Sequence, residues 1–371
     1  MSLDFKIGMV APSRAGKTTL MTAVFHEMQK KLSGNARNIQ YWADGKATQN
    51  AISRALAEFS TCTAADDIFE VPQIKSTEDT SNYRFAITVP TEAGTQRINI
   101  DIMDYPGGLL GTADFADKVE RHLVASSALL VPIPSDVLME WKRTYKANSA
   151  QSKKINIIAA TMLEVDNVTT VVADWLKRKA AAQEPASLIF VPIRCEAYFS
   201  DNGGARDESA VLHQAVKELY LSRLELTKEI RDLIQVEIQA VDTYGIVELR
   251  DITLANSGDG SEVLVSTFRK RLNQGGVIKS RGAFEVLSSI IDFRLGAYAR
   301  KLNIQKDDLK QKLRDRGFFA DILAFIFGDD LKKQLVEHMR MYDTSYSAMS
   351  VIADMKTSYP NRQVEINVVG D

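Results

Sequence analysis

The sequence is short of the residues that build disulfide scaffolds and metal clusters. Its 371 residues include two cysteines, Cys62 and Cys195, and four histidines, all scattered along the chain. The two thiols lack the spacing of a zinc site or of a disulfide framework, which favours a reducing compartment and predicts a cytoplasmic protein. The scattered histidines argue against a zinc site for the same reason.

Long apolar runs and an excess of charge of one sign are also missing. The longest apolar run, 318–327, contains Asp321 and falls short of the ~18 residues of a membrane span, and the first residues lack the pattern of a signal peptide. The net charge is −2, so bulk charge attracts neither nucleic acid nor an anionic membrane. We therefore expect a globular protein with no nucleic-acid partner and no membrane association.

Apolar strands alternate with helices along most of the chain. Strands are expected at 5–11, 83–89, 97–104, 128–134, 187–193 and 234–245, and helices at 16–33, 45–59, 114–125, 135–182, 207–233 and 279–302. The stretch 154–162 fits a strand as well as a helix. Alternation of this kind predicts an α/β fold, a mostly parallel sheet with helices on both faces and one antiparallel edge hairpin at 83–104.

A phosphate-binding loop is predicted between the first strand and the first helix. The run Ala11-Pro12-Ser13-Arg14-Ala15-Gly16-Lys17-Thr18 satisfies the P-loop pattern except at its first position, where alanine replaces glycine. Backbone N–H groups and the helix dipole would surround the phosphates, together with Thr19. Lys17 would reach the β- and γ-phosphates, and Thr18 would ligate Mg²⁺. The alternative is a lysine and a threonine at an ordinary helix start.

The end of the hairpin resembles the magnesium motif of GTPases. Asp104 and Gly107 match its Asp-x-x-Gly pattern, in which the aspartate holds the metal shell and the glycine N–H senses the γ-phosphate. Asp101 is the alternative metal residue, but strand alternation turns it to the opposite face. A switch threonine is expected just before the hairpin, at Thr77 or else at Thr80, unless these are ordinary loop residues.

Two later strand ends resemble the base-recognition motifs of GTPases. Glu196 falls where a carboxylate pairs with guanine, and Arg194 falls where a long cationic stem covers the base, although Ile193 replaces the usual asparagine. The loop Ala240–Gly245, which contains Asp242, lies where a backbone contact to the base is expected. The alternative for Glu196 is a solvated carboxylate at the end of a strand.

Together these motifs resemble the translation-factor-related (TRAFAC) class of P-loop GTPases, and within it bacterial GTPase-like proteins with degenerate base motifs. The resemblance covers roughly residues 5–300 and implies a Ras-like domain over 1–302, with GTP or GDP and Mg²⁺ as cofactors. A mainly helical extension is expected over 303–371. Its aromatic cluster at 318–327 must be covered by the domain, by a protein partner or second copy, or by a membrane.

Catalysis is expected to be slow. The residue after Gly107 is Gly108, so the water-positioning side chain of Ras-like enzymes is missing. Arg14 lies inside the loop and is either a catalytic arginine or a solvent-facing one. The prediction is a GTP-dependent switch, with hydrolysis stimulated by a partner through the C-terminal region. An ATP-using P-loop enzyme and a non-hydrolysing scaffold are the alternatives.

Overall fold

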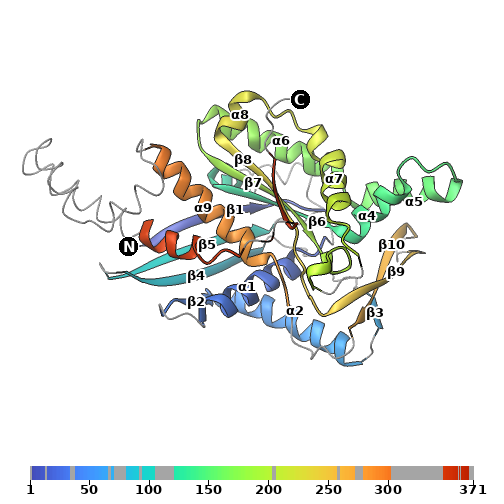
Figure 1. The fold of residues 1–371 in the computed structure, drawn as a ribbon, viewed down its shortest axis with the longest axis horizontal. Coiled ribbons are helices and arrows are strands. Elements are labelled where there is room, and N and C mark those ends of the chain that lie inside the picture. The colour runs from blue at the N-terminus through green and yellow to red at the C-terminus, as the bar shows by residue number, and fades with distance from the viewer. Residues whose placement is uncertain are drawn as a thin grey trace, which may run out of the picture.

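The computed structural model describes residues 2–12, 15–33, 38–65, 68–70, 81–91, 94–104, 121–202, 206–256, 260–271, 279–301, 346–357, 359 and 361–366 (Figure 1). The main sheet contains β1 (Ser2–Met9), β2 (Gln40–Ala43), β4 (Ser81–Thr91), β5 (Gly94–Asp104), β6 (Ala128–Pro134), β7 (Ala186–Ile193), β8 (Ile234–Gln239) and β11 (Gln363–Glu365). Its strand order is β11-β8-β7-β6-β1-β5-β4-β2. A small second sheet contains β3 (Ile68–Glu70), β9 (Val247–Asn256) and β10 (Glu262–Lys270).

The predicted fold class is confirmed. The five central strands β5, β1, β6, β7 and β8 run parallel, and β4 pairs with β5 as the antiparallel hairpin. Two short strands that the sequence reading missed extend the sheet at both edges, because β2 pairs outside β4 and β11 pairs outside β8. Strand β1 lies between β5 and β6, where the strand order reverses. Open α/β sheets bind ligands outside the carboxyl ends of the strands at such a point.

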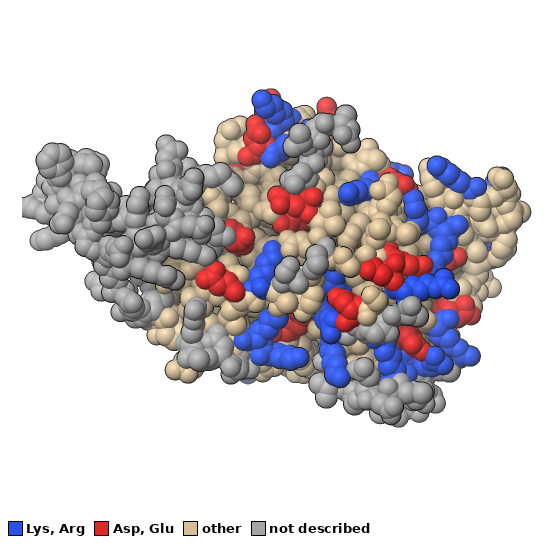
Figure 2. Space-filling model, in the orientation of Figure 1, with Lys and Arg blue, Asp and Glu red and all other residues tan. Residues whose placement is uncertain are grey.

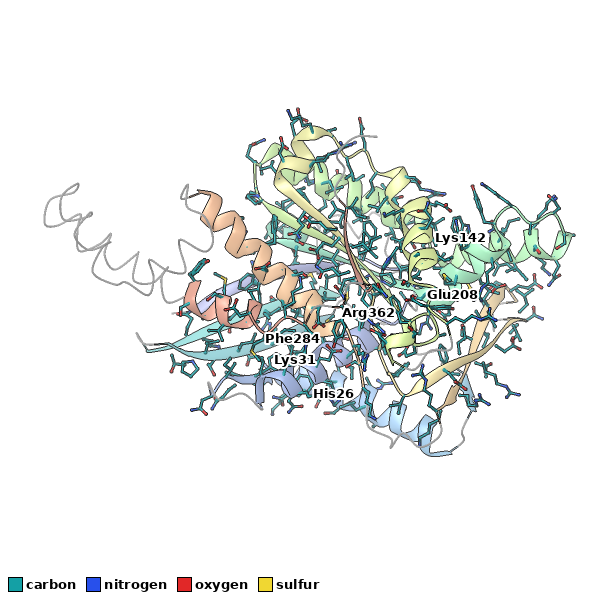
Figure 3. All side chains as sticks on the ribbon, viewed as in Figure 1. His26, Lys31, Lys142, Glu208, Phe284 and Arg362 are labelled. Atoms are coloured by element: carbon teal, nitrogen blue, oxygen red, sulfur yellow. The ribbon has the colours of Figure 1, made fainter. Side chains whose placement is uncertain are left out.

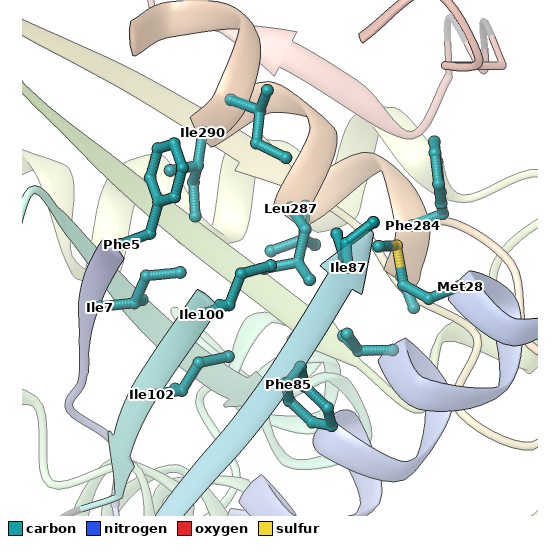
Figure 4. Packing of buried hydrophobic residues seen from close by; sticks show 14 of the residues in the cluster. Phe5, Ile7, Met28, Phe85, Ile87, Ile100, Ile102, Phe284, Leu287 and Ile290 are labelled. Carbon is teal, nitrogen blue, oxygen red and sulfur yellow. The ribbon is translucent and has the colours of Figure 1, made fainter. Parts of the chain in front are cut away.

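Helices cover both faces of the sheet. They are α1 (Lys17–Ser33), α2 (Lys46–Ala65), α4 (Ser135–Thr144), α5 (Ala150–Met162), α6 (Val165–Ala181), α7 (Ser209–Leu219), α8 (Lys228–Leu233) and α9 (Ala283–Lys301). Helices α1 and α9 cover one face, where Phe284, Leu287 and Ile290 of α9 meet sheet side chains such as Ile7 and Ile100 (Figure 4). Helices α4, α6 and α7 pack against the other face. Two apolar layers thus hold the strands from both sides.

A charged contact joins α1 to α9. The Lys31 Nζ atom lies 2.6 Å from a carboxylate oxygen of Glu285 and 4.3 Å from the ring centre of Phe284 (Figure 3). The backbone N–H of Phe284 donates to the Glu27 carboxylate at 2.8 Å. Burial, together with the charge of Glu285, raises the pKa of Glu27 to about 7. The contact between the helices therefore contains one acidic group, Glu27, whose pKa lies near neutral pH.

The described residues of the C-terminal region belong to the same domain. Helical residues 346–353 place Tyr346, Ala348, Met349 and Ile352 in the core on the α9 side of the sheet. Residues 363–365 then add β11 to the sheet edge. The boundary expected at residue 303 and the aromatic cluster at 318–327 lie outside the described residues.

Three local expectations were wrong or incomplete. The helix expected over 207–233 is divided into α7 and α8, and the ambiguous stretch 154–162 is helical, in α5. The sequence reading also missed the hairpin β9–β10, although its strands alternate around a glycine-containing turn. This hairpin packs on α5, where Lys154 contacts Glu262 at 2.6 Å and Leu264 is buried.

Charges of both signs are mixed on the surface (Figure 2), and one helical stretch is long and apolar. Acidic and basic side chains are interspersed over the face shown in Figure 2. Among the described residues one helical stretch, 150–181, is long and apolar enough to cross a membrane by length and composition alone. That stretch consists of α5 and α6, with Glu164 in a left-handed conformation between them, and α6 buries Val168, Val172 and Trp175 in the core.

Candidate functional site

The loop after β1 is held by backbone hydrogen bonds near both of its ends. The N–H of Val10 donates to the Leu130 carbonyl of β6 at 2.9 Å, and the N–H of Ala15 donates to the Pro12 carbonyl at 3.2 Å. Helix α1 then begins with the Leu20 N–H donating to the Gly16 carbonyl. The first amides of α1 have no partner inside the helix, so they and the helix dipole favour an anion here. Ser13 and Arg14 lie outside the described residues.

Glycine is required at one end of this loop and not at the other. Gly16 has φ of +94°, and a Cβ placed there would come within 2.9 Å of the Ile193 Cδ1 atom. Ala11, which replaces the first glycine of the pattern, has no left-handed backbone in the structure and is fully buried. The alanine therefore imposes no backbone strain on the loop. Ile193, which replaces the asparagine of the base motif, packs against the loop at Gly16.

The side chains of the first turn of α1 have defined surroundings. Lys17 and Thr19 are buried, with 7% and 9% of their surface exposed. The Thr18 hydroxyl oxygen accepts a hydrogen bond of 3.1 Å from the Tyr83 hydroxyl of β4. The Thr22 hydroxyl donates to the Thr18 carbonyl. These contacts fix the turn from which Lys17 and Thr18 are predicted to act.

The end of β5 lies beside the loop. Asp104 is opposite Met9 in the parallel register, whereas Asp101 is opposite Lys6 and lies mid-strand. At ~3.3 Å per residue, Asp101 is about 10 Å further from the loop. The backbone thus supports Asp104 over Asp101. The side chain of Asp104 lies outside what the structure describes, as do Gly107 and Thr77.

The described residues near Thr18 offer oxygen atoms, the kind of ligand that Mg²⁺ takes. In the described part of the chain no group of three or more His, Cys, Asp or Glu side chains is placed to hold a metal ion. Mg²⁺ takes few protein ligands, mainly oxygens, and completes its shell with water and substrate phosphates. The Thr18 hydroxyl at the loop and the strand end at Asp104 are compatible with such a site.

Glu196 lies where the ends of β7 and β8 meet, and it is fully buried. One carboxylate oxygen accepts the backbone N–H groups of Tyr244 at 2.6 Å and Gly245 at 3.0 Å. The other oxygen is buried with no hydrogen-bond partner among the described residues. Burial, reinforced by the charge of Asp242, raises the pKa of Glu196 to about 7. Glu196 therefore organises the loop Ala240–Gly245 and keeps one oxygen unused.

Arg194 is held inside the protein. Its backbone is left-handed, with φ of 59°, and its guanidinium lies 2.8 Å from Asp136 in the first turn of α4. Both side chains are buried. Asp136 also accepts a hydrogen bond from Ser266 of β10. Arg194 thus joins β7, α4 and the small sheet, and its predicted contact with a base stays a prediction.

Asp242 pairs with a residue 120 positions further along the chain. The buried Arg362 guanidinium donates to both Asp242 oxygens, at 2.9 and 2.7 Å, and to Asp201 at 2.8 and 2.6 Å. It also lies 4.2 Å from the ring centre of Phe199. Arg362, Asp136, Asp201 and Tyr83 were missed by the sequence reading, since isolated charged or aromatic residues carry no motif.

The amino-terminal part of the chain is similar to a known family. Residues 5–113 match the model of the YcjX-like family, DUF463. That stretch contains the loop 10–16, α1 and the hairpin β4–β5, and it covers less than half of the chain. A comparison with curated proteins gave no match.

Among solved structures, the chain is similar to the GTPase-like domain of S. cerevisiae Ski7, crystallised bound to GTP. The alignment has a TM-score of 0.29 and 12% identity over 64% of this chain. This chain spans 43% of the Ski7 chain. So distant a likeness adds nothing to the assignment of the site, which depends on the contacts described above.

Proposed function

We propose that this protein binds GTP with Mg²⁺ at the loop 11–19 and works as a slow GTPase switch. The observation that carries the proposal is the strand–loop–helix unit of β1, Gly16-Lys17-Thr18 and α1 at the centre of the parallel sheet. Helix amides, a buried lysine and a hydroxyl converge there, and this combination suits a polyphosphate and its metal ion.

The proposal assigns one task to each residue. Lys17 neutralises the β- and γ-phosphates, Thr18 and Asp104 hold Mg²⁺ directly or through water, and Thr77 closes onto the metal in the GTP state. Gly107 senses the γ-phosphate. Mg²⁺, when bound, neutralises charge on the phosphates. Since Gly108 supplies no water-positioning side chain, hydrolysis is slow and is stimulated by a protein partner or a second copy, bound through residues 303–371. The two scattered cysteines suit a cytoplasmic location.

The experiment is a titration of the purified protein with fluorescent GTP and ATP in the presence of Mg²⁺. Lys17→Ala is expected to abolish binding, because charge-assisted contacts with two phosphates are lost. Lys30→Ala is the matched control, since Lys30 is an exposed lysine at the other end of α1. The proposal fails if Lys17→Ala keeps micromolar affinity, or if the wild type binds neither nucleotide.

A second candidate is an ATP-using protein. It is favoured by the burial of Glu196 and by the hydrogen bonds that this side chain already accepts. Its side chain is fully buried and one oxygen already serves Tyr244 and Gly245, so the preference for guanine depends on the remaining oxygen. Glu196→Gln keeps an acceptor for the two amides. It should weaken the preference for GTP over ATP about tenfold or more if the carboxylate pairs with guanine. An unchanged preference would instead support the ATP-using candidate.

A further inference from the structure

Tyr83 connects the antiparallel hairpin to the first turn of α1. It is the third residue of β4, its side chain is 2% exposed, and its hydroxyl donates to the Thr18 hydroxyl oxygen at 3.1 Å. In the sequence Tyr83 follows the expected switch threonines Thr77 and Thr80. A residue that follows the expected switch segment in sequence thus contacts the hydroxyl that is expected to bind the metal ion.

A second tyrosine nearby, Tyr41, serves as a comparison for this contact. Tyr41 of β2 stacks on Phe85, a neighbour of Tyr83 along β4, with ring centres 5.7 Å apart. The Tyr41 hydroxyl is buried and has no hydrogen-bond partner among the described residues. A tyrosine hydroxyl buried in this sheet therefore does not always find a hydrogen-bond acceptor. Tyr83 finds one because the Thr18 hydroxyl lies within reach at the start of α1.

The bond has a defined effect on the Thr18 hydroxyl. A threonine hydroxyl has one hydrogen to donate and two lone pairs that accept. Donation by Tyr83 occupies one lone pair and leaves the other lone pair and the hydrogen available. The free rotation of the hydroxyl is thereby restricted. Mg²⁺ demands near-ideal octahedral geometry at short distances, so a ligand that is already oriented binds it better.

We propose that Tyr83 is a positioning residue for the metal site. Its hydroxyl orients the Thr18 hydroxyl so that the free lone pair of the Thr18 oxygen can be donated to Mg²⁺, and Tyr83 thereby sets the Mg²⁺ requirement of nucleotide binding. This inference rests on the proposed function. Tyr83 lies outside the P-loop pattern, because it belongs to the hairpin and not to the loop.

The test compares the wild type with two variants, Tyr83→Phe and Tyr41→Phe. Each variant removes a buried hydroxyl and keeps the aromatic ring. Fluorescent GTP is titrated at increasing Mg²⁺ and in excess EDTA. Tyr83→Phe should raise the Mg²⁺ concentration for half-maximal effect roughly two- to tenfold, the range expected for one hydrogen bond. Its affinity in EDTA should stay within about twofold of wild type, and Tyr41→Phe should match wild type throughout.

A double-mutant cycle supplies the second readout. In a Thr18→Ala background, Tyr83→Phe should cause no further shift in the Mg²⁺ requirement, because the Thr18 hydroxyl that Tyr83 orients is already absent. The inference is overturned if Tyr83→Phe leaves the Mg²⁺ requirement unchanged, if affinity falls equally in EDTA, or if Tyr41→Phe shifts the requirement equally. A wild type that binds no nucleotide refutes the proposed function itself and this inference with it, and the wild-type titration shows which has failed.

Discussion

Replacing Arg362 by methionine tests whether the C-terminal residues hold the loop at the end of β8. The change keeps a long unbranched side chain and removes the guanidinium, which is fully buried between Asp242 and Asp201. Asp242 is fully buried as well, whereas Asp201 is 38% exposed. Water can therefore solvate the charge of Asp201 more readily than that of Asp242 once the guanidinium is removed. The broken pair with Asp242 then accounts for most of the lost stability.

Breaking a buried ion pair by removing one partner costs about 3–5 kcal/mol, since the remaining charge stays in a dry environment. The stacking on Phe199 at 4.2 Å adds about 1 kcal/mol. We therefore expect Arg362→Met to lower the free energy of unfolding by about 5 kcal/mol. Urea unfolding followed by circular dichroism measures this loss, and added salt should change it little because a buried pair is weakly screened.

The control is Arg143→Met, which removes an exposed guanidinium that contacts Glu208 at 3.2 Å. An exposed pair of this kind contributes about 1 kcal/mol or less. Adding Asp242→Asn to Arg362→Met should recover part of the stability, because the buried charge is then absent. A loss from Arg362→Met no larger than that of the control would refute the reasoning.

Three further predictions concern the rest of the molecule. Gly245→Ala should lower the free energy of unfolding in urea by about 3 kcal/mol or more, because Gly245 has φ of +73° and a Cβ would overlap the Lys279 carbonyl. The control is Gly260→Ala, at a left-handed site with open space, which should lower it by about 1 kcal/mol. Equal losses in the two variants would contradict the packing argument. Because the folded-state pKa of Glu27 is raised to about 7, its contribution to stability is full below the unfolded value near 4.5 and is lost as the pH rises to about 7. Glu27→Gln should make the unfolding free energy decline less over that interval, and identical pH profiles would refute this. Ending the chain after residue 302 removes the buried residues of 346–353, Arg362 and β11, and should give an unstable or insoluble protein. The control, a chain ending at Ile366, should keep the wild-type melting temperature. A stable, soluble chain of 302 residues would show that these contacts are dispensable.

Local pattern determined much of the fold. The apolar stretch of β1 and the helical periodicity of α1 lie next to each other in sequence, so this strand and this helix were predictable without tertiary contacts. The alternation of β4 and β5 likewise predicted the hairpin. The parallel sheet followed from the alternation of strands and helices, because parallel strands need crossover connections.

Only the tertiary structure decided how the charged residues at the strand ends are used. The sequence placed Glu196 and Asp242 at the ends of β7 and β8, but burial and pairing depend on groups far away along the chain. Glu196 meets the amides of Tyr244 and Gly245, and Asp242 meets Arg362 across 120 positions. A carboxylate at a strand end has the same local sequence whether it faces solvent, a ligand or a buried arginine. Its role is set by the desolvation and the partners that the folded chain brings to it.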